Sequence, residues 1–243
     1  MYTQAELDCL DPTRIPEHIA IIPDGNRRWA KRQELSVEKG HKQGADILMQ
    51  TLRAAKKIGV KTLTFYTFST ENWNRSESEV EGLMWLIESY LESEMATMAE
   101  ESVRLSTIGQ VDKLGQSLQT TLQRAKALTE ECHEIELVLA LNYGARDEMV
   151  RACRKIAQEV AMGQIQPQDI DEATLSRRLD TYLWKDPDLL IRTSGECRLS
   201  NFLLWQLSYA EIYLSSVYWP DFTPQHLLEA VLSYQERDRR LGE

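Results

Sequence analysis

The stretch HIAIIPDGNRRWAK, residues 18–31, contains an apolar run, an abrupt stop and the start of a possible helix. The apolar run is typical of a buried strand, and the Pro-Asp-Gly-Asn sequence after it is a turn signal. Free N–H groups at the start of a helix attract anions, and open α/β sheets bind ligands at the carboxyl ends of their strands. The stretch therefore predicts an anion-binding site at one edge of a parallel sheet.

One acidic side chain, Asp24, stands beside Arg27 and Arg28 in this stretch. A carboxylate would repel a bare phosphate, but a divalent cation can bridge the two, since magnesium prefers one or two carboxylates together with phosphate oxygens. Taken alone, the Asp-Gly-Asn sequence fits an ordinary turn equally well, with the arginines on a solvated surface. Motifs elsewhere in the chain are needed to choose between an anion-binding site and an ordinary turn.

Apolar, β-branched runs alternate with amphipathic segments along the chain. We expect strands at residues 18–22, 60–68, 103–108, 135–141, 189–192 and 212–217, and helices at 41–58, 77–99, 111–130, 145–162, 172–181 and 224–240. This alternation predicts an α/β fold with a mostly parallel central sheet and helices on both faces. No linker or repeat divides the 243 residues, so we expect a single domain over 1–243, with residues 1–15 loosely ordered.

Two of the expected helices begin with local signals. Ser76 followed by Glu79 is a capping box, and Thr223 before Pro224 is an N-cap with proline at the first helical position. The apolar stripe of residues 77–99 is wider than one packing face needs. The pattern alone indicates a helix that is buried on two sides.

The composition limits the classes of partner and compartment. A net charge of −10 argues against nucleic-acid binding and against electrostatic docking on an anionic membrane. The four cysteines form no C-x-x-C pair and the four histidines have no metal-ligand spacing, which is typical of a reduced, cytoplasmic protein without a zinc site. No apolar run is long enough for a transmembrane segment, and the first residues have no secretion signal, so we expect a soluble protein.

Five blocks, in order, resemble the motifs of the cis-prenyltransferases, the undecaprenyl diphosphate synthase family. They are the block at 18–31, GHKQG at 40–44, FSTENWNR at 68–75, NYG at 142–144, and IRTSGECRLSNFLLWQ at 191–206 followed by AEIY at 210–213. The resemblance implies an enzyme that condenses isopentenyl diphosphate repeatedly onto an allylic diphosphate, with farnesyl diphosphate expected. The product would be a long-chain cis-polyprenyl diphosphate, the undecaprenyl carrier lipid of cell-wall synthesis, which is delivered to the membrane.

The resemblance also implies magnesium (Mg2+) as the cofactor, a hydrophobic tunnel and a homodimer. Residues 77–99 and the preceding helix would line the tunnel, with Ala45 near its mouth. The dimer contact would bury an apolar group of four residues, Phe202, Leu203, Leu204 and Trp205.

Roles for individual residues follow from the same resemblance. Asp24 and Asn72 are expected to be catalytic, and Asp24 and Glu211 to bind the metal, Glu211 across the dimer contact. The residues expected to bind the two diphosphates are Gly25, Asn26, Arg27, Arg28, Trp29, His41, Ser69, Thr70, Glu71, Trp73, Arg75, Arg192, Arg198, Leu199 and Ser200. Glu79 is a secondary candidate for a residue of the site. Asn72, His41, Asp24 and the departing diphosphate all remain possible proton acceptors.

Two positions depart from the family pattern. Arg27 stands where many bacterial members have glycine, and Val37 stands where the family usually has an arginine, four residues before His41. The missing arginine puts one phosphate contact in doubt. Arg27 or Lys39 could replace it, and Arg27 is favoured because it lies in the anion-binding turn itself.

Three other classes fit less well. Trans-prenyl and terpene synthases need an aspartate-rich D-D-x-x-D motif, and this chain has no Asp-Asp pair. A generic phosphohydrolase would leave Arg192, Arg198 and Ser200 unexplained. An inactive accessory subunit would lose the D-G-N and R-x-S chemistry, which this chain keeps.

Overall fold

The computed structural model describes residues 2–237, and its centre is a six-stranded sheet. All neighbouring strands run parallel, in the order β3-β4-β2-β1-β5-β6. The predicted α/β class is therefore confirmed, and the sheet is wholly parallel. The strands are β1 (His18–Ile22), β2 (Thr62–Ser69), β3 (Val103–Ile108), β4 (Ile135–Tyr143), β5 (Leu189–Arg192) and β6 (Glu211–Leu214).

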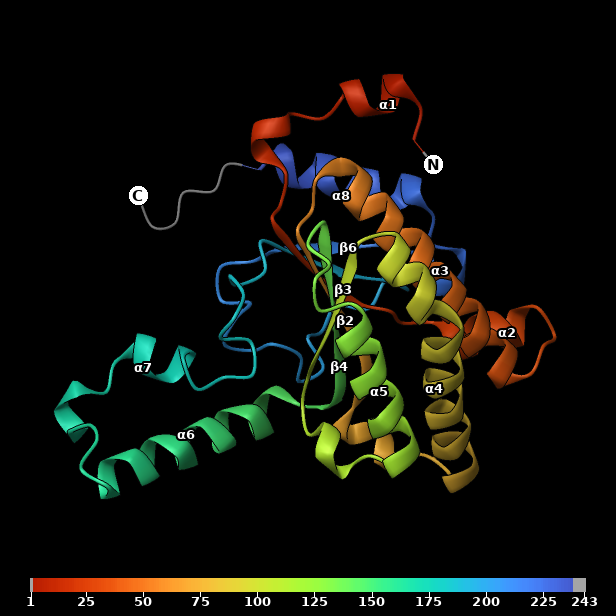
Figure 1. Cartoon of the computed structure of the whole chain (residues 1–243). Helices are drawn as coiled ribbons and strands as arrows, with labels where there is room; N and C mark the ends of the chain where they lie inside the picture. The colour runs from red at the N-terminus through yellow and green to blue at the C-terminus, as the bar shows by residue number, and fades with distance from the viewer. Residues whose placement is uncertain (1, 238–243) are drawn as a thin grey trace.

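Helices lie on both sides of this sheet (Figure 1). On one side lie α3, α4, α5 and α8, and on the other α6 and α7 extend away from the sheet. The helices are α1 (Gln4–Asp8), α2 (Asn26–Arg32), α3 (Val37–Ile58), α4 (Glu77–Glu100), α5 (Gln116–Leu128), α6 (Ala145–Ala161), α7 (Glu172–Ser176) and α8 (Pro224–Gln235). None of the described helices is both long and apolar enough to cross a membrane.

Two hydrophobic cores form because successive side chains of a strand point to opposite faces. In β1, Ile19 and Ile21 join the larger core under α3, α4, α5 and α8. Ala20 and Ile22 join the smaller core on the opposite face, together with Phe202. Every residue of β1 is thus buried, as expected for a strand inside a parallel sheet that is covered on both sides.

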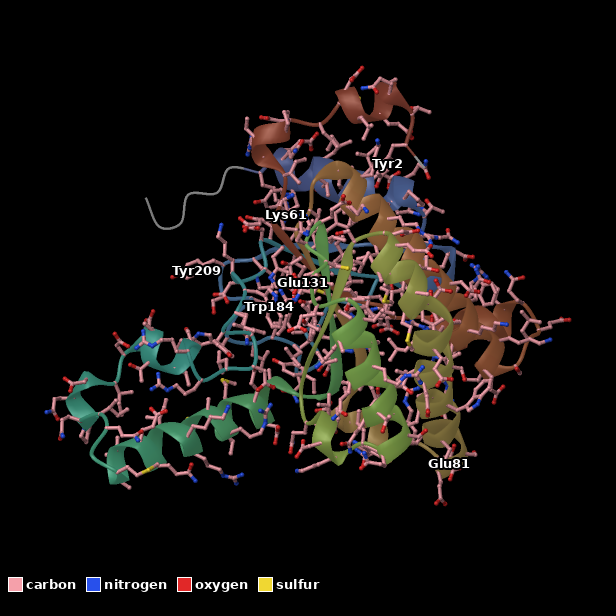
Figure 2. The ribbon with its side chains drawn as sticks, viewed as in Figure 1. Tyr2, Lys61, Glu81, Glu131, Trp184 and Tyr209 are labelled. Atoms are coloured by element: carbon pink, nitrogen blue, oxygen red, sulfur yellow. The ribbon has the colours of Figure 1, made fainter. Side chains whose placement is uncertain are left out.

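Several element boundaries differ from the sequence predictions. Helix α3 begins at Val37, α5 spans only 116–128, and α7 ends at Ser176. The predicted end of the last helix, residues 238–240, lies outside the described residues. Residues 2–15 differ from the expected loosely ordered segment: α1 forms there, and Tyr2 is buried and donates a hydrogen bond to the carbonyl of Pro224 at 3.0 Å (Figure 2).

One of the two predicted helix caps is correct. Thr223 is the N-cap of α8, with Pro224 as the first helical residue. The capping box at Ser76 is wrong, because Ser76 precedes α4 without a capping hydrogen bond. Glu79 instead binds Arg75 at 2.7 Å.

Candidate active site

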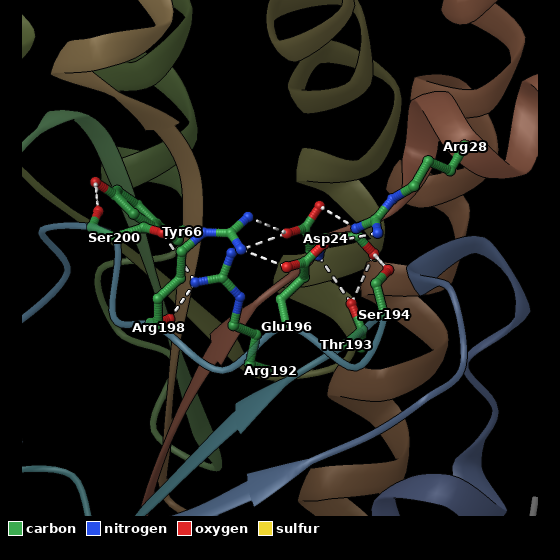
Figure 3. Close-up of polar contacts among 9 residues, drawn as sticks. All are labelled: Asp24, Arg28, Tyr66, Arg192, Thr193, Ser194, Glu196, Arg198 and Ser200. Atoms are coloured by element: carbon green, nitrogen blue, oxygen red, sulfur yellow. Dashed lines mark hydrogen bonds and ion pairs between the residues drawn. The ribbon is translucent and has the colours of Figure 1, made fainter.

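The carboxyl ends of β1, β2 and β5 meet at one edge of the sheet, and Asp24 lies just beyond β1. Its carboxylate accepts hydrogen bonds from Arg192 at 2.9 Å and from Arg28 at 3.2 Å, and Arg198 lies 3.8 Å away (Figure 3). Burial would raise the pKa of Asp24, but the hydrogen bond and charge of Arg192, together with those of Arg28, outweigh it and lower the pKa. The carboxylate is therefore ionised, and with 28 % of its side chain exposed it stays accessible to a ligand.

The backbone of Asp24 is held by two hydroxyl groups from the segment after β5. The hydroxyl of Thr193 accepts from the Asp24 N–H at 2.8 Å and donates to the Asp24 carbonyl at 2.7 Å. The hydroxyl of Ser194 donates to the same carbonyl at 2.7 Å. Gly25 follows with φ of 108°, and a Cβ there would lie 2.2 Å from the Ser194 hydroxyl, so this turn requires glycine.

The β5 block forms a second group of cations beside Asp24. Arg192 is buried. Its guanidinium donates to the hydroxyl of Ser200 at 2.9 Å and to the carbonyl of Arg198. Glu196 binds Arg28 at 2.7 Å and also pairs with Arg198. Glu196 thus links cations from both predicted diphosphate sites. Sequence reasoning missed this residue, although it is the one acidic side chain within the IRTSGECRLS block.

The loop after β2 carries the third group of predicted residues, at Thr70–Asn74, a short 3-10 helix. Asn72 is held by the Ser69 N–H, which donates to its side-chain oxygen at 3.0 Å. Trp73 donates to the side chain of Asn142 at 2.8 Å, which explains the position of the NYG motif beside the site. Arg75 is turned toward Glu79 and not toward Asp24.

These groups surround one polar pocket of about 600 Å³. Eight of the residues predicted to be catalytic or to bind diphosphate line it: Asp24, Ser69, Glu71, Asn72, Arg75, Arg192, Arg198 and Ser200. Pro23, Tyr66, Asn72 and Arg75 also line an adjacent apolar cavity of about 170 Å³. The polar pocket and the apolar cavity are therefore neighbours along a shared border.

The apolar cavity lies between α3, α4 and the sheet. Its apolar lining consists of Ala45, Leu48, Phe65, Leu83, Leu86, Ile87, Tyr90, Leu91, Met98, Leu137, Leu139 and Trp219. This cavity accounts for the wide apolar stripe of α4, because one side of the stripe packs on the core and another faces the cavity. Ala45, predicted on the preceding helix near the mouth of the tunnel, lines this cavity from α3.

His41 and Asn26 stand where the polar and apolar regions meet. The Asn26 amide nitrogen lies 3.4 Å from His41 Nδ1, and both residues line the apolar cavity. Burial, with a further contribution from Arg75, lowers the pKa of His41 to about 4, so the ring is neutral at pH 7. Within the described residues, His41 Nε2 and Asn26 Oδ1 are buried without hydrogen-bond partners, which leaves two polar atoms free for a ligand.

Some predicted residues lie outside the polar pocket. Trp29 donates to Asp221 at 2.6 Å, which fastens α2 to the segment before α8. Arg27 is 61 % exposed and lies 3.7 Å from Glu79. Thr70 and Leu199 line neither the polar pocket nor the apolar cavity.

Glu211 does not approach Asp24 within the chain. It pairs with Leu189 at the start of β5, three residues before Arg192, which is about 10 Å along a strand. Its carboxylate binds Arg237 at 2.5 Å. The described residues contain no group of three or more His, Cys, Asp or Glu side chains that could hold a metal.

The apolar group predicted for the dimer contact has to be corrected. Phe202 and Leu203 are fully buried in the smaller core of their own chain, so they cannot form a subunit contact. Phe202 stacks on Tyr66 with ring centroids 4.3 Å apart. Leu204 and Trp205 are partly buried, and Trp205 donates to Ser176 at 3.0 Å.

Comparison with known proteins places this chain among enzymes of isoprenoid synthesis. Residues 22–242 match the family described as "Putative undecaprenyl diphosphate synthase". An isoprenyl transferase of Chlamydia trachomatis is 47% identical over 94% of this chain and 92% of its own length. A Lactiplantibacillus plantarum protein named ditrans,polycis-undecaprenyl-diphosphate synthase ((2E,6E)-farnesyl-diphosphate specific) is 47% identical over 96% of this chain and 91% of its own.

Two solved structures are similar across nearly the whole chain. Lavandulyl diphosphate synthase from Lavandula x intermedia, in complex with dimethylallyl diphosphate, has a TM-score of 0.93 and 40% identity, and covers 95% of this chain and 100% of its own. A probable undecaprenyl diphosphate synthase from Campylobacter jejuni has a TM-score of 0.78 and 30% identity, and covers 94% of this chain and 99% of its own.

Proposed function

This chain belongs to the undecaprenyl diphosphate synthase family of prenyltransferases, and we propose that it condenses isopentenyl diphosphate repeatedly onto an allylic diphosphate to make a long cis-polyprenyl diphosphate. The observation that carries this proposal is the polar pocket, which is lined by Arg75, Arg192 and Arg198 and borders an apolar cavity. Two diphosphates and one growing hydrocarbon tail need such a pair of neighbouring spaces. The name of the L. plantarum relative supports farnesyl diphosphate as the primer.

The turn between β1 and α2 would hold the allylic diphosphate. The N–H groups at the start of α2 and the guanidinium of Arg28 supply positive charge there. The difficult step is departure of a polyanion from carbon. Fixed donors that stabilise this developing charge usually make the largest single contribution to catalysis.

Arg192, Arg198 and Ser200 would hold the diphosphate of isopentenyl diphosphate. Arg192 is already oriented by Ser200 and by the Arg198 carbonyl, so its guanidinium has little freedom to lose on binding. Glu196 pairs with both Arg198 and Arg28. Substrate diphosphates would compete with this carboxylate for both cations.

Asp24 fits the binding of Mg2+ on the chemistry of its surroundings. Its carboxylate is ionised, partly exposed and lines the polar pocket, and magnesium binds well to one carboxylate together with phosphate oxygens. When bound, the ion would neutralise charge on the departing diphosphate. Glu211 of the same chain lies too far along the strand to share this site, which leaves Glu211 of a second subunit as the candidate.

The low pKa of His41 bears on the choice of proton acceptor. A general base works best when its pKa is near the working pH, and a pKa of about 4 makes His41 a weak base at pH 7. We therefore favour the remaining acceptors, among them the departing diphosphate. His41 would instead orient the primer through its neutral ring.

The proposal includes a homodimer in the cytoplasm that supplies the carrier lipid of cell-wall synthesis to the membrane. Strand β6 is at the edge of the sheet, and its Ile212 and Leu214 are exposed, so a two-fold contact along this edge would cover apolar surface. Glu211 lies on the same strand. All four cysteines are unpaired, which agrees with a reducing compartment.

Incubation of the purified protein with farnesyl diphosphate, labelled isopentenyl diphosphate and Mg2+ tests the proposal. We expect incorporation of label into long-chain products, whose length chromatography measures and whose cis double bonds NMR identifies. Absence of incorporation with geranyl, farnesyl and geranylgeranyl primers would support an inactive accessory subunit instead. Products with trans double bonds would refute the proposed stereochemistry.

A further inference from the structure

A second cavity lies between the first turns of α3 and α4, beside the apolar cavity. Its volume is about 180 Å³, and its lining comes from these two helices. Val37 and His41 contribute from α3, and Gly82, Leu83, Trp85 and Leu86 contribute from α4. None of the predicted steps of the reaction uses this space.

The two cavities share a wall. His41, Leu83 and Leu86 line both of them, so a single layer of side chains separates the second cavity from the first. The second cavity is therefore a side branch of the first.

Gly82 is unusual in the lining of the side branch because the helix does not need a glycine there. Glycine in a helix interior destabilises the helix relative to alanine. A Cβ at Gly82 would meet no atom within 4 Å, so neighbouring atoms do not demand its absence. Because Gly82 has no side chain, open space remains in the side branch at this position.

The outer end of the branch belongs to the half of α4 with fewer buried residues, and the lining of the branch also includes the charged residues Glu38, Lys39, Lys42 and Glu79. Trp85 is 68 % exposed at this end. The buried residues of α4 are Val80, Leu91, Met95 and Met98, three of them in its second half. Segments with few buried apolar contacts open at the lowest free energy, so the first half of α4 can move away from α3 more easily than the second.

We infer that the side branch is a lateral exit, through which the isoprenoid tail of the product reaches the surface between α3 and α4. This inference rests on the proposed function, which puts the diphosphate in the polar pocket and the tail in the apolar cavity. A tail that left lengthwise would have to pass the arginines of the polar pocket. The lateral route keeps the hydrocarbon against Leu83, Leu86 and Trp85 until it leaves.

Closing the branch with Gly82→Leu tests this exit. The new side chain enters open space, so the fold is retained, and we expect the first condensations in a single turnover to stay within about twofold of the parent rate. Multiple-turnover synthesis should slow at least fivefold, because release of product limits the rate of many enzymes. Glu81→Leu adds the same side chain on the adjacent residue, which points away from the molecule (Figure 2), and should change neither rate.

A spectroscopic measurement separates an exit from a general effect on α4. The emission of Trp85, taken as the difference between the parent and Trp85→Phe, should shift to shorter wavelength as product forms, and the shift should be absent in Gly82→Leu. Equal multiple-turnover rates in Gly82→Leu and Glu81→Leu, or equal slowing of the first condensations, would overturn the lateral exit. A parent protein that forms no product at all would instead refute the proposed function.

Discussion

Replacing Thr193 by valine measures how far the Asp24 carboxylate depends on the hydroxyl that holds its backbone. Thr193 is fully buried, and its hydroxyl makes hydrogen bonds of 2.8 Å and 2.7 Å with the N–H and carbonyl of Asp24. Valine has nearly the same shape without the hydroxyl. The substitution therefore removes two hydrogen bonds and leaves most of the packing in place.

The expected loss of stability can be worked out from these contacts. A hydrogen bond contributes about 0.5–1.5 kcal/mol net, so two would contribute about 1–3 kcal/mol. Neither backbone group is left alone, because the Asp24 N–H lies 3.0 Å from the Ile22 carbonyl and the Asp24 carbonyl still accepts from Ser194. We therefore expect the lower part of the range, about 1–2 kcal/mol, which lowers the unfolding temperature by roughly 2–8 °C for a domain of this size.

The effect on activity should be larger than the effect on stability. A displacement of about 1 Å in a catalytic group can cost about 100-fold in rate, so we expect Thr193→Val to lower kcat/KM at least about tenfold. The half-saturating Mg2+ concentration should rise as well, because Asp24 is the proposed metal ligand. Steady-state kinetics over a magnesium series, with thermal unfolding measured by circular dichroism, provides both quantities.

Thr193→Ser is the matched control because it keeps the hydroxyl and removes only a methyl group. Its kcat/KM should stay within about threefold of the parent, a transition-state effect below 1 kcal/mol. Parental activity in both the valine and the serine variant would refute a positioning role of the hydroxyl. Equal losses in both would show that Thr193 acts through packing alone.

Four further substitutions test other parts of the site. Asp24→Asn keeps the shape of the side chain but removes its charge. We expect kcat to fall by about 100-fold or more, as for loss of one preorganised electrostatic contact. Activity within tenfold of the parent would exclude Asp24 as the metal ligand. Ala45→Trp fills the apolar cavity, so chromatography should show shorter products while the first condensations continue. Arg27→Gly should raise the KM for farnesyl diphosphate more than that for isopentenyl diphosphate, and adding Val37→Arg should recover part of the loss; an unchanged primer KM would show that Arg27 does not compensate. His41→Gln should flatten the pH dependence of stability. The pKa of His41 in the folded chain, about 4, is below its ordinary value of 6.5, so the unfolded chain binds more protons between these pH values. The free energy of unfolding of the parent should therefore fall by roughly 3 kcal/mol as the pH falls from 6.5 to 4, and that of the variant should fall less.

Local pattern was sufficient for the strands because each is a short apolar run between turn signals. The predicted bounds of β1, β3 and β5 agree with those observed. Helix ends were less predictable, because contacts from distant segments determine where a helix stops. After α7 ends at Ser176, Arg178 binds Glu159 on α6, a contact with no local sequence signal.

The fold class, the family and the edge of the sheet at which the site lies could all be predicted from the sequence. These properties depend on short-range patterns and on the rule that parallel strands end at the same edge. The partners of the charged groups depend on how distant segments pack together: Glu196 bridges Arg28 and Arg198, Arg75 turns to Glu79, and Glu211 lies far from Asp24. The cavities beside α4 also belong to the tertiary structure, since the volume that packing leaves between helices depends on side chains that no local pattern brings together.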